Sequence, residues 1–505
     1  MSDEVKDIQT ESDSATQTSS YRSIFKATSL FGGVQVYQIL IQLVKSKFVA
    51  VLLGPLGVGI IGLYQSGIQL IQSLTSMGLA SSAVRDVSEA NGSRDQYRIA
   101  KVITVVRRLV WITGLLGLIV VAFCAPLLSQ ISFGNKDYTV PFIILSITLL
   151  FDQISAGQKV VLQGLRKLKE LAKCSAFGAT FGLIVSVPLY YWLGVKGILP
   201  TLILNSLCAL VVSWLYSRRI KLASVTVTPS ETIQQGKQML VMGLSMSASA
   251  ILTTAVAYVI KSFIQNDSGV KEVGLYQAGF VIMNTYVGLI FNAISTDFYP
   301  RLAAVNKDNN QCSILISQQG EIATMILAPM LSFCLIFMPF ILKILYSEEF
   351  TSANGYIIWA CLGMMFRMSS WVVSYIFVAK AEAKLFMINE IAASFYTLFF
   401  SLFGYRIAGL RGLGIAFFLA YFAYNIQVYL IARKKYSFNY SKDFLIGFSL
   451  HLIIVLSCLT IAELMTGWQR YLTGIIAVGI SIAYGFCGLN KKMDIIGALR
   501  ARRKL

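Results

Sequence analysis

The stretch VGIIGLYQSG (58–67) recurs further along the chain as GVKEVGLYQAG (269–279). Both copies contain the word Gly-Leu-Tyr-Gln, which begins at Gly62 in the first copy and at Gly274 in the second, an offset of 212 residues. A word repeated inside apolar sequence indicates that the chain contains two related units.

A second pair of similar stretches supports this repeat. The sequence YYWLGVKGILP (190–200) parallels FGYRIAGLRGLGI (403–415), with Gly194 and Gly409 aligned at an offset of 215 residues. Two matches at nearly the same offset predict two similar halves, each with the same number of helices.

The composition is that of a polytopic membrane protein. Of the 505 residues, 56% are apolar and only 13% are charged, and the mean hydropathy is +0.68. Soluble domains are about 25% charged, whereas an apolar run of about 20 residues is long enough for a helix to cross a bilayer. Membrane β-strands would alternate polar and apolar residues in segments of about 10. We therefore expect an all-α protein with about 14 transmembrane helices. The expected spans are 24–53, 57–84, 103–131, 138–164, 174–193, 197–217, 238–264, 271–299, 314–345, 351–378, 385–405, 412–432, 443–463 and 470–489.

The repeat divides these helices into domains. Helices 1–6 and 7–12 form two six-helix lobes related by a pseudo-twofold axis, and both enter the membrane from the same side because six is even. Parallel repeats of this kind enclose a central cavity that opens to each side in turn. The expected domains are a disordered cytoplasmic tail (1–22), an N-lobe (23–221), a cytoplasmic linker (222–237), a C-lobe (238–436), two extra C-terminal helices (437–490) and a basic cytoplasmic tail (491–505).

The net charge of +19 is interpreted as a topology signal. Most Lys and Arg residues follow the even-numbered spans, and the loops on the other side hold few. Because cytoplasmic loops are enriched in Lys and Arg, both termini are expected in the cytoplasm. The expected surrounding is the lipid bilayer, and no nucleic-acid partner is expected.

The chain offers little for catalysis or for a cofactor. His451 is the only histidine, and the eight cysteines are scattered without a C-x-x-C pair, so neither a metal site nor a histidine triad is expected. The sequence has no P-loop for ATP, and the loops expected on the outside are short. No cofactor is expected, although a coupling proton or sodium ion stays open.

The stretch KFVAVLLGPLGVGIIGLYQ (47–65) resembles the first hairpin of Wzx-type polysaccharide flippases. The shared features are a lysine seven residues before Gly54 and the motif G-P-x-G-V-G at 54–59. These flippases belong to the multidrug/oligosaccharidyl-lipid/polysaccharide exporter superfamily, and the resemblance extends in outline over helices 1–12. Helices 13 and 14 go beyond the usual twelve, as in the related peptidoglycan-precursor flippases.

The resemblance implies a flippase that moves undecaprenyl-pyrophosphate-linked oligosaccharide, such as an O-antigen repeat unit, from the cytoplasmic to the periplasmic leaflet. It implies a multi-pass protein of the bacterial inner membrane that acts in lipopolysaccharide or other polysaccharide biosynthesis, with the polymerase machinery as a partner. One alternative is a cation-coupled multidrug antiporter of the same superfamily, whose site would be acidic and aromatic. The charge within the spans is mainly basic, which favours an anionic cargo. A membrane glycan polymerase or transferase is the other alternative.

Charged residues inside the spans indicate the site, because one at a helix centre costs roughly 2.5–3.5 kcal/mol. The residues expected to bind the pyrophosphate are Lys45, Lys47, Lys159, Lys261 and Arg367. Lys45 and Lys261 lie at similar places in the first helices of the two lobes, where a twofold axis would bring them towards one cavity. Lys47 lies about 200° around the helix from Lys45, so contact with the outer headgroups is its alternative role.

Amide and hydroxyl side chains form stripes that suit a sugar. Gln35, Gln38, Gln42 and Lys45 are spaced 3, 4 and 3 apart and so share one helix face. Against lipid such groups would be unsatisfied, so they face a hydrated cavity or pair between helices, and both interpretations stay open. The residues expected to line the sugar site are Gln35, Gln38, Gln42, Gln65, Gln69, Gln72, Tyr258, Gln277 and Asn284.

Three carboxylates are candidates for ion coupling, namely Asp152, Asp297 and Glu390, and their spacing selects none of them. Each also has a structural alternative. Asp297 could pair with Arg301, four residues further along a helix, Glu390 could pair with Arg367, and Asp152 could pair with a lysine of the cavity.

Overall fold

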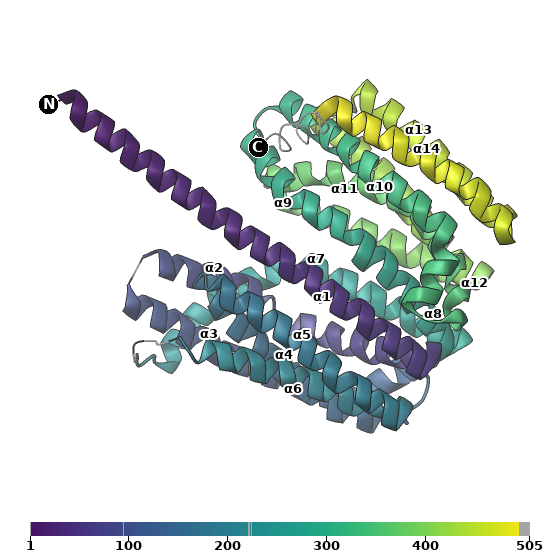
Figure 1. Cartoon of the computed structure of the whole chain (residues 1–505). Helices are drawn as coiled ribbons and strands as arrows, with labels where there is room; N and C mark the ends of the chain where they lie inside the picture. The colour runs from purple at the N-terminus through teal and green to yellow at the C-terminus, as the bar shows by residue number, and fades with distance from the viewer. Residues whose placement is uncertain (1, 94, 221–222, 224, 494–505) are drawn as a thin grey trace. The chain divides into compact units, whose positions relative to one another are not determined.

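The computed structural model describes residues 2–93, 95–220, 223 and 225–493, without the side chains of residues 2–32, 286, 292, 293, 296 and 493. Every regular element in these ranges is a helix (Figure 1). The α-helices are α1 (Ser2–Thr75), α2 (Leu79–Gly92), α3 (Gln96–Phe133), α4 (Thr139–Gly164), α5 (Leu168–Leu193), α6 (Ile198–Ser217), α7 (Pro229–Ser268), α8 (Val270–Val281), α9 (Gly288–Ala304), α10 (Asn309–Leu345), α11 (Asn354–Ala379), α12 (Ala383–Tyr436), α13 (Lys442–Leu464) and α14 (Gly467–Met493). The shorter elements are the 3-10 helices η1 (Gly194–Gly197) and η3 (Glu348–Ala353) and the π-helix η2 (Ile282–Val287).

The described part of the chain contains 11 helices that are long and apolar enough to cross a membrane. Three of them, at Gly33–Thr75, Leu168–Ser217 and Ala383–Tyr436, each overlap two of the expected spans. The 11 helices therefore account for the spans expected from the sequence, and the all-α polytopic fold is confirmed. The side chains of residues 1–32 and all of 494–505 lie outside the described residues, so the expected disordered and basic tails stay predictions.

The helices pack into two compact units that do not follow the chain in strict order. Unit 1 comprises residues 1–53, 67–131 and 135–251, and unit 2 comprises residues 54–66, 132–134 and 252–505. The first part of α7 therefore belongs to unit 1 and its last part to unit 2. Helix α7 begins at Pro229, inside the segment 222–237 that was expected to be a linker.

Glycines with positive φ interrupt the long helices. Gly54, Gly194, Gly269 and Gly409 have φ values of 63°, 55°, 89° and 54°, which glycine adopts without the steric penalty of a Cβ. Gly194 and Gly409, which the repeat aligns, also have nearly the same ψ, −133° and −135°. The two positions are thus equivalent in conformation as well as in sequence.

A segment of α1 that belongs to unit 2 packs against α8 through a reciprocal contact. A Cβ at Gly59 would lie 2.1 Å from the carbonyl oxygen of Val270, and a Cβ at Gly274 would lie 1.8 Å from that of Pro55. Small residues allow membrane helices to approach this closely. The contact relates Gly59 to Gly274, whereas the word match in the sequence relates Gly62 to Gly274. A twofold relation between the two close approaches would pair Gly59 with Gly274 and Pro55 with Val270, at an offset of 215 residues, which is that of the second match.

Unit 1 has an aliphatic core between three of its helices. Buried members of this core include Val87 of α2, Val106 of α3 and Val161 of α4. The Nζ atom of Lys101 on α3 lies 2.5 Å from the Oε1 atom of Glu231, which fixes the start of α7 against α3.

Unit 2 is built around α11, which is buried along most of its length. Aromatic side chains fill the space around it. The ring of Tyr356 lies 5.2 Å from that of Tyr276 on α8 and 6.4 Å from that of Phe417 on α12, edge to face in both cases. Such pairs add about 0.5–1.5 kcal/mol beyond the area they bury.

Helices α13 and α14 lie along α10 in unit 2 (Figure 1). Pro339 has no N–H, so the carbonyl group of Leu335 lacks its helical donor. Arg470 of α14, which is only 7% exposed, donates hydrogen bonds to the oxygen of Leu335 at 2.6 Å and to that of Ile336 at 3.1 Å. The arginine thus satisfies a carbonyl group that the proline leaves without a partner.

A second proline of α10 is covered by the same helix. Pro329 frees the carbonyl group of Met325, and Gly485 of α14 lies so close that a Cβ there would be 2.7 Å from that oxygen. Near the far end of α14, Lys492 forms an ion pair with the buried carboxylate of Glu321 on α10. The sequence of α14 therefore matches the irregularities of α10 along most of its length.

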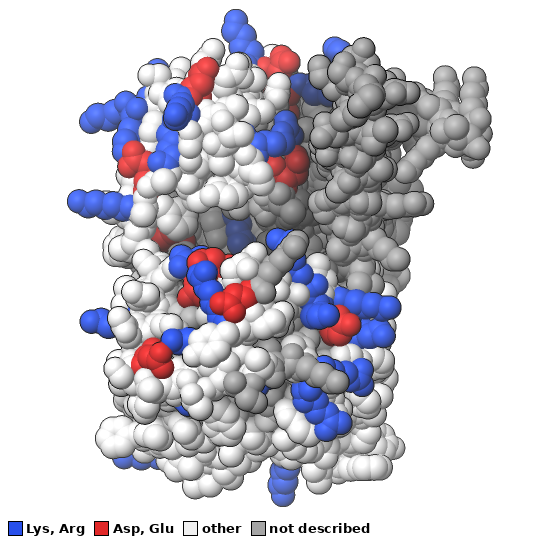
Figure 2. All heavy atoms as spheres, turned by 90° about the vertical axis from the view of Figure 1, so that its left-hand side faces the viewer, with Lys and Arg blue, Asp and Glu red and all other residues white. Residues whose placement is uncertain are grey.

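Many large apolar side chains lie on the surface. Figure 2 shows a face on which uncharged residues predominate, with Lys and Arg more numerous than Asp and Glu. Large apolar side chains such as Phe123, Trp192 and Ile407 are 85%, 76% and 69% exposed, as expected where lipid replaces water around a protein.

Candidate substrate cavity

Unit 2 contains a cavity of about 260 Å³, bounded by α7, α8, η2, α11 and α12. Its lining combines charged, hydroxyl and aromatic groups. The polar lining residues are Thr253, Tyr276, Asn284, Tyr356, Arg367, Ser370, Ser374, Glu390, Ser394, Thr397, Ser401, Tyr421 and Tyr424. Apolar rings, including those of Phe280, Trp371 and Phe417, complete the wall.

Arg367 is the basic residue of this lining, and it is half-buried. Its Nη1 atom donates a hydrogen bond to the Oδ1 atom of Asn284 at 2.6 Å. Its guanidinium carbon lies 5.2 Å from the ring centre of Tyr421 and 5.6 Å from that of Phe291. A cation over aromatic faces is attracted by their quadrupoles, so the rings hold the guanidinium in place while leaving most of its N–H donors for a ligand.

Asn284 lies in the π-helix η2, and this irregularity explains its position. Its Nδ2 atom donates to the carbonyl oxygen of Phe280 at 3.2 Å, which leaves Oδ1 for Arg367. A π-helical turn adds a residue to an α-helix and is frequent at functional sites. The sequence analysis placed Asn284 in a sugar site but predicted neither the π-helix nor the bond to Arg367.

Sequence reasoning missed the hydroxyl groups of the cavity, although the signal was present. Glu390, Ser394, Thr397 and Ser401 line the cavity from α12, and their spacing of 4, 3 and 4 places them on one helix face. The glutamine stripes were found by this same rule. Serine and threonine can bond to the backbone of their own helix, so a stripe of them is a weaker signal than a stripe of glutamines.

The residue before Glu390 anchors the two arms of α12 to each other. Asn389 is buried and accepts a hydrogen bond from the Nε2 atom of Gln427 at 2.7 Å. The Oε1 atom of Gln427 in turn accepts one from the hydroxyl of Tyr396 at 2.5 Å. Buried polar networks of this kind are stabilising when every member is satisfied, and this one holds the cavity wall that carries Glu390.

Three other predicted residues of unit 2 lie outside the cavity lining as described. Lys261 is only 7% exposed, and its Nζ atom is 5.9 Å from the ring centre of Phe280. The hydroxyl of buried Tyr258 shares a hydrogen bond of 2.9 Å with Ser132. Gln277 lies where α1 and α8 cross, with its Cγ atom 3.4 Å from the position of a Cβ at Gly62.

The predicted glutamine stripes differ in exposure from one residue to the next. The exposed members are Gln35, Gln42, Gln65 and Gln69, and the half-buried ones are Gln38 and Gln72. Lys45 and Lys47 are both half-buried. All of these residues except Gln65 belong to unit 1, whereas every residue that lines the cavity belongs to unit 2.

The remaining charged candidates have structural partners. Asp152 and Lys159 lie half-buried on α4 of unit 1, where the Asp152 carboxylate interacts with the Ser206 hydroxyl and with the charge of Lys159. The carboxylate of Asp297 is 75% exposed and accepts a bond of 3.1 Å from Arg301, as predicted for an ion pair on the helix surface. Arg367 bonds to Asn284, and it shares its cavity with Glu390.

Comparison with known proteins gives consistent matches. The family model described as polysaccharide biosynthesis protein matches residues 48–354. The Lipid III flippases of Escherichia coli (strain K12) and Shigella flexneri are each 22% identical over 422 residues, which is 82% of this chain and 100% of theirs. Among solved structures, an inward-facing multidrug resistance MATE family transporter of the MOP superfamily matches with a TM-score of 0.67 and 19% identity, over 79% of this chain and 94% of that one. The Lipid II flippase MurJ, in an inward closed conformation, matches with a TM-score of 0.65 and 14% identity, over 92% of this chain and 99% of that one.

The described residues form a multi-pass membrane protein, and its fold is similar to that of MOP-superfamily transporters. The family model matches more than half of the chain. The protein belongs to the polysaccharide biosynthesis protein family.

Proposed function

We propose that this protein translocates an undecaprenyl-pyrophosphate-linked oligosaccharide, such as an O-antigen-like repeat unit, from the cytoplasmic to the periplasmic leaflet of the bacterial inner membrane by alternating access. The observation that carries the proposal is Arg367 in a cavity rich in hydroxyl groups. A guanidinium binds phosphate oxygens through two parallel hydrogen bonds, and hydroxyl groups can donate to and accept from sugars. The similarity to flippases for Lipid III and Lipid II supports a lipid-linked cargo.

The proposed roles follow the chemistry of each residue. Arg367 binds the pyrophosphate from unit 2, while Lys45, Lys47, Lys159 and Lys261 supply further positive charge along the route. The glutamine stripes and the hydroxyl groups of α12 bind the sugars, while the lipid tail stays in the bilayer. The cavity of about 260 Å³ is smaller than the 300–1,000 Å³ of most ligand sites, so it forms one part of the binding site.

We assign ion coupling to Glu390. Glu390 is half-buried, and among the described lining residues it is the one that carries a carboxylate. Asp297 is exposed and already paired with Arg301, and a carboxylate in water-exposed contact with arginine has little reason to change its protonation during transport. Both termini are proposed to be cytoplasmic, with the polymerase machinery receiving the product on the other side.

The proposal is tested by measuring translocation in proteoliposomes. A fluorescent undecaprenyl-pyrophosphate-linked oligosaccharide is placed in both leaflets, and an impermeant reductant bleaches only the outer pool. Arg367→Gln is expected to slow the protein-dependent loss of the protected pool about 10–100-fold, since a bond to a charged group contributes about 1.5–3 kcal/mol. Arg367→Lys keeps the charge without the planar guanidinium, so its translocation rate should lie between that of the wild type and that of Arg367→Gln.

The matched control is Arg301→Gln, because Arg301 is an exposed arginine whose bond is to Asp297. This variant should translocate at the wild-type rate. A wild-type rate in Arg367→Gln, with equal reconstitution, would count against the proposed site. Dependence of the rate on a proton or sodium gradient, lost in Glu390→Gln, tests the coupling.

A cation-coupled multidrug antiporter is the second candidate, and the same cavity gives the reason. Glu390 lies in it together with the rings of Tyr276, Tyr356, Trp371 and Tyr421, which is the lining that a cationic drug requires. Arg367 opposes this function, because a second cation beside it would be repelled. Resistance of cells to cationic dyes upon expression, lost in Glu390→Gln but kept in Arg367→Gln, would favour the antiporter.

A further inference from the structure

Unit 1 contains a second and larger cavity, which is lined by other residues than the cavity of unit 2. It measures about 790 Å³ and lies between α3, α4 and α6. All of its lining residues belong to unit 1. Its lining shares no residue with the cavity of unit 2 and includes none of the site residues predicted from the sequence.

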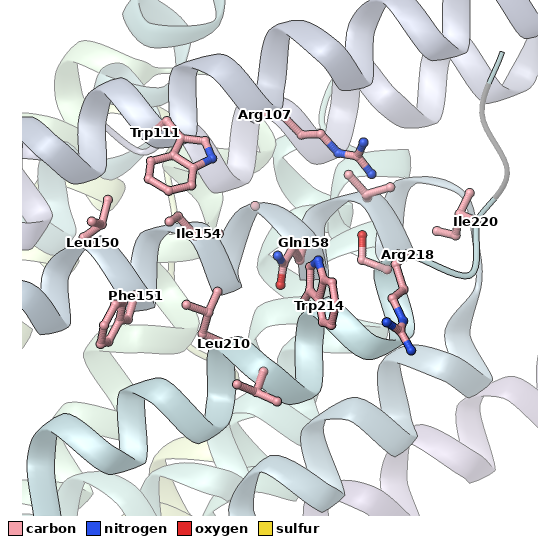
Figure 3. Close-up of a pocket in the computed structure, with 14 residues that line it drawn as sticks. Arg107, Trp111, Leu150, Phe151, Ile154, Gln158, Leu210, Trp214, Arg218 and Ile220 are labelled. Carbon is pink, nitrogen blue, oxygen red and sulfur yellow. The ribbon is translucent and has the colours of Figure 1, made fainter. Parts of the chain in front are cut away.

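The two ends of this cavity differ in character. Arg107 and Arg218 lie at one end, and Trp111, Leu150 and Phe151 lie towards the other (Figure 3). Both arginines are exposed. The cavity therefore has a cationic end and an apolar body, as an amphiphile requires.

The lining residues at the cationic end leave the two guanidinium groups available. Arg218 stacks over Trp214, with its guanidinium carbon 4.5 Å from the ring centre, which orients the group but uses none of its N–H donors for oxygen. The neighbouring Arg108, by contrast, donates to the oxygen of Val227 at 2.8 Å. Of these two adjacent arginines, Arg108 is bonded to the backbone, whereas Arg107 lines the cavity.

The body of the cavity offers little to a sugar. Gln158 contributes an amide group to the lining, but the Oε1 atom of Gln158 already accepts a hydrogen bond of 2.5 Å from the Ser213 hydroxyl. Trp111 and Trp214 are 51% and 49% exposed, and tryptophan is enriched where headgroups meet hydrocarbon. By the positive-inside rule, the end with the arginines is the cytoplasmic one.

We propose that this cavity is a binding site for an anionic glycerophospholipid of the cytoplasmic leaflet, whose phosphate lies between Arg107 and Arg218 and whose acyl chains lie along Trp111, Leu150 and Phe151. Basic pockets between membrane helices on the cytoplasmic side recognise anionic headgroups. The apolar body suits acyl chains better than an oligosaccharide, which separates this ligand from the transported cargo. The site does not depend on the proposed function.

The experiment measures quenching of Trp111 fluorescence by brominated phospholipids in nanodiscs. The reporter protein keeps Trp111 and carries phenylalanine at the other five tryptophan positions. Brominated phosphatidylglycerol should reach half-maximal quenching at a mole fraction about 30-fold lower than brominated phosphatidylcholine, because each of the two arginines contributes about 1 kcal/mol. The Arg107→Gln, Arg218→Gln double variant should show no preference between the two lipids.

The matched control is the Lys169→Gln, Lys173→Gln double variant, which removes two exposed positive charges from α5 outside the cavity. It should keep the preference. Equal quenching by both lipids in the unchanged reporter would overturn the proposal, since it means ordinary contact with bulk lipid. Quenching by neither lipid would also overturn it, since another occupant then fills the cavity.

A second measurement covers the case in which the single-tryptophan protein does not fold. Native mass spectrometry of the wild-type protein, released from micelles of mixed phospholipids, should show one anionic lipid retained in preference to phosphatidylcholine. The arginine double variant should lose that adduct while the lysine double variant keeps it. Retention of the anionic lipid by both double variants would refute a site at the arginines.

Discussion

Replacing Arg470 with methionine is expected to destabilise the packing of α14 on α10. The change removes hydrogen bonds of 2.6 Å and 3.1 Å to the carbonyl groups of Leu335 and Ile336 while keeping an apolar side chain of similar length. A buried carbonyl left without a partner costs about 1–3 kcal/mol. Removing a buried guanidinium recovers part of this cost, since burial of a charge is itself unfavourable. We expect the free energy of unfolding to fall by about 1–3 kcal/mol.

A double-mutant cycle with Pro339 isolates the mechanism. In Pro339→Ala the backbone regains an N–H that can bond to Leu335, so Arg470 loses part of its role. Arg470→Met should therefore cost about 1–2 kcal/mol less in the alanine background than in the wild type. Pro329→Ala is the matched control, because Arg470 bonds to carbonyl groups near the other proline, and its effect should add to that of Arg470→Met.

The assay is unfolding in mixed micelles, followed by the reactivity of thiols that are buried in the folded protein. Cys334 and Cys458 suit this purpose, because they lie on α10 and α13 and are 9% and 0% exposed. Additivity of Arg470→Met and Pro339→Ala within about 0.5 kcal/mol would refute the interpretation that the arginine compensates for the proline.

Three further predictions concern close contacts. Gly485→Ala places a Cβ 2.7 Å from the oxygen of Met325, so thiol-monitored unfolding should show a loss of about 1–3 kcal/mol; an unchanged midpoint would contradict the close approach. Gly274→Ala places a Cβ 1.8 Å from the oxygen of Pro55 and should lower folded yield or translocation in proteoliposomes by at least tenfold, while alanine at Gly288, where nothing lies within 4 Å, should leave both unchanged. Asn284→Ala removes the acceptor of a 2.6 Å bond from the cavity arginine and should slow translocation about tenfold; a normal rate together with normal folding would show that the arginine needs no such support.

The membrane spans could be predicted because their cause is local. A run of about 20 apolar residues has to satisfy its backbone within one helix, whatever surrounds it. The breaks were also visible as glycines at equivalent places, of which Gly194 and Gly409 have nearly the same conformation. The pairing of Gly59 with Gly274 could not be predicted. The four-residue word that begins at Gly62 and at Gly274 is a stronger sequence match than the single glycine at position 59.

The candidate site was predicted only in part. A charge such as Arg367 attracts notice in any apolar span, because its cost there is high. The serine and threonine residues on α12 carry a low cost, because they bond to their own helix, and so their pattern is weak. The π-helix at η2 depends on packing between α8 and its neighbours, which no local sequence rule predicts. The roles of Lys45, Lys47, Lys159 and Lys261 stay predictions that transport measurements on single variants would test.

The reciprocal contact at Gly59 and Gly274 also bears on how the chain is made. The α1 segment of unit 2 leaves the ribosome first, but its partner on α8 follows only after unit 1 has been completed up to residue 251. At about 5–20 residues per second, the roughly 200 residues between them take roughly 10–40 s to synthesise. A fragment that begins at residue 252 would lack the segment altogether. Unit 2 is therefore not contiguous in the chain, although nearly all of it lies in the second half, and we expect separately expressed halves to fold only when both are produced in the same membrane.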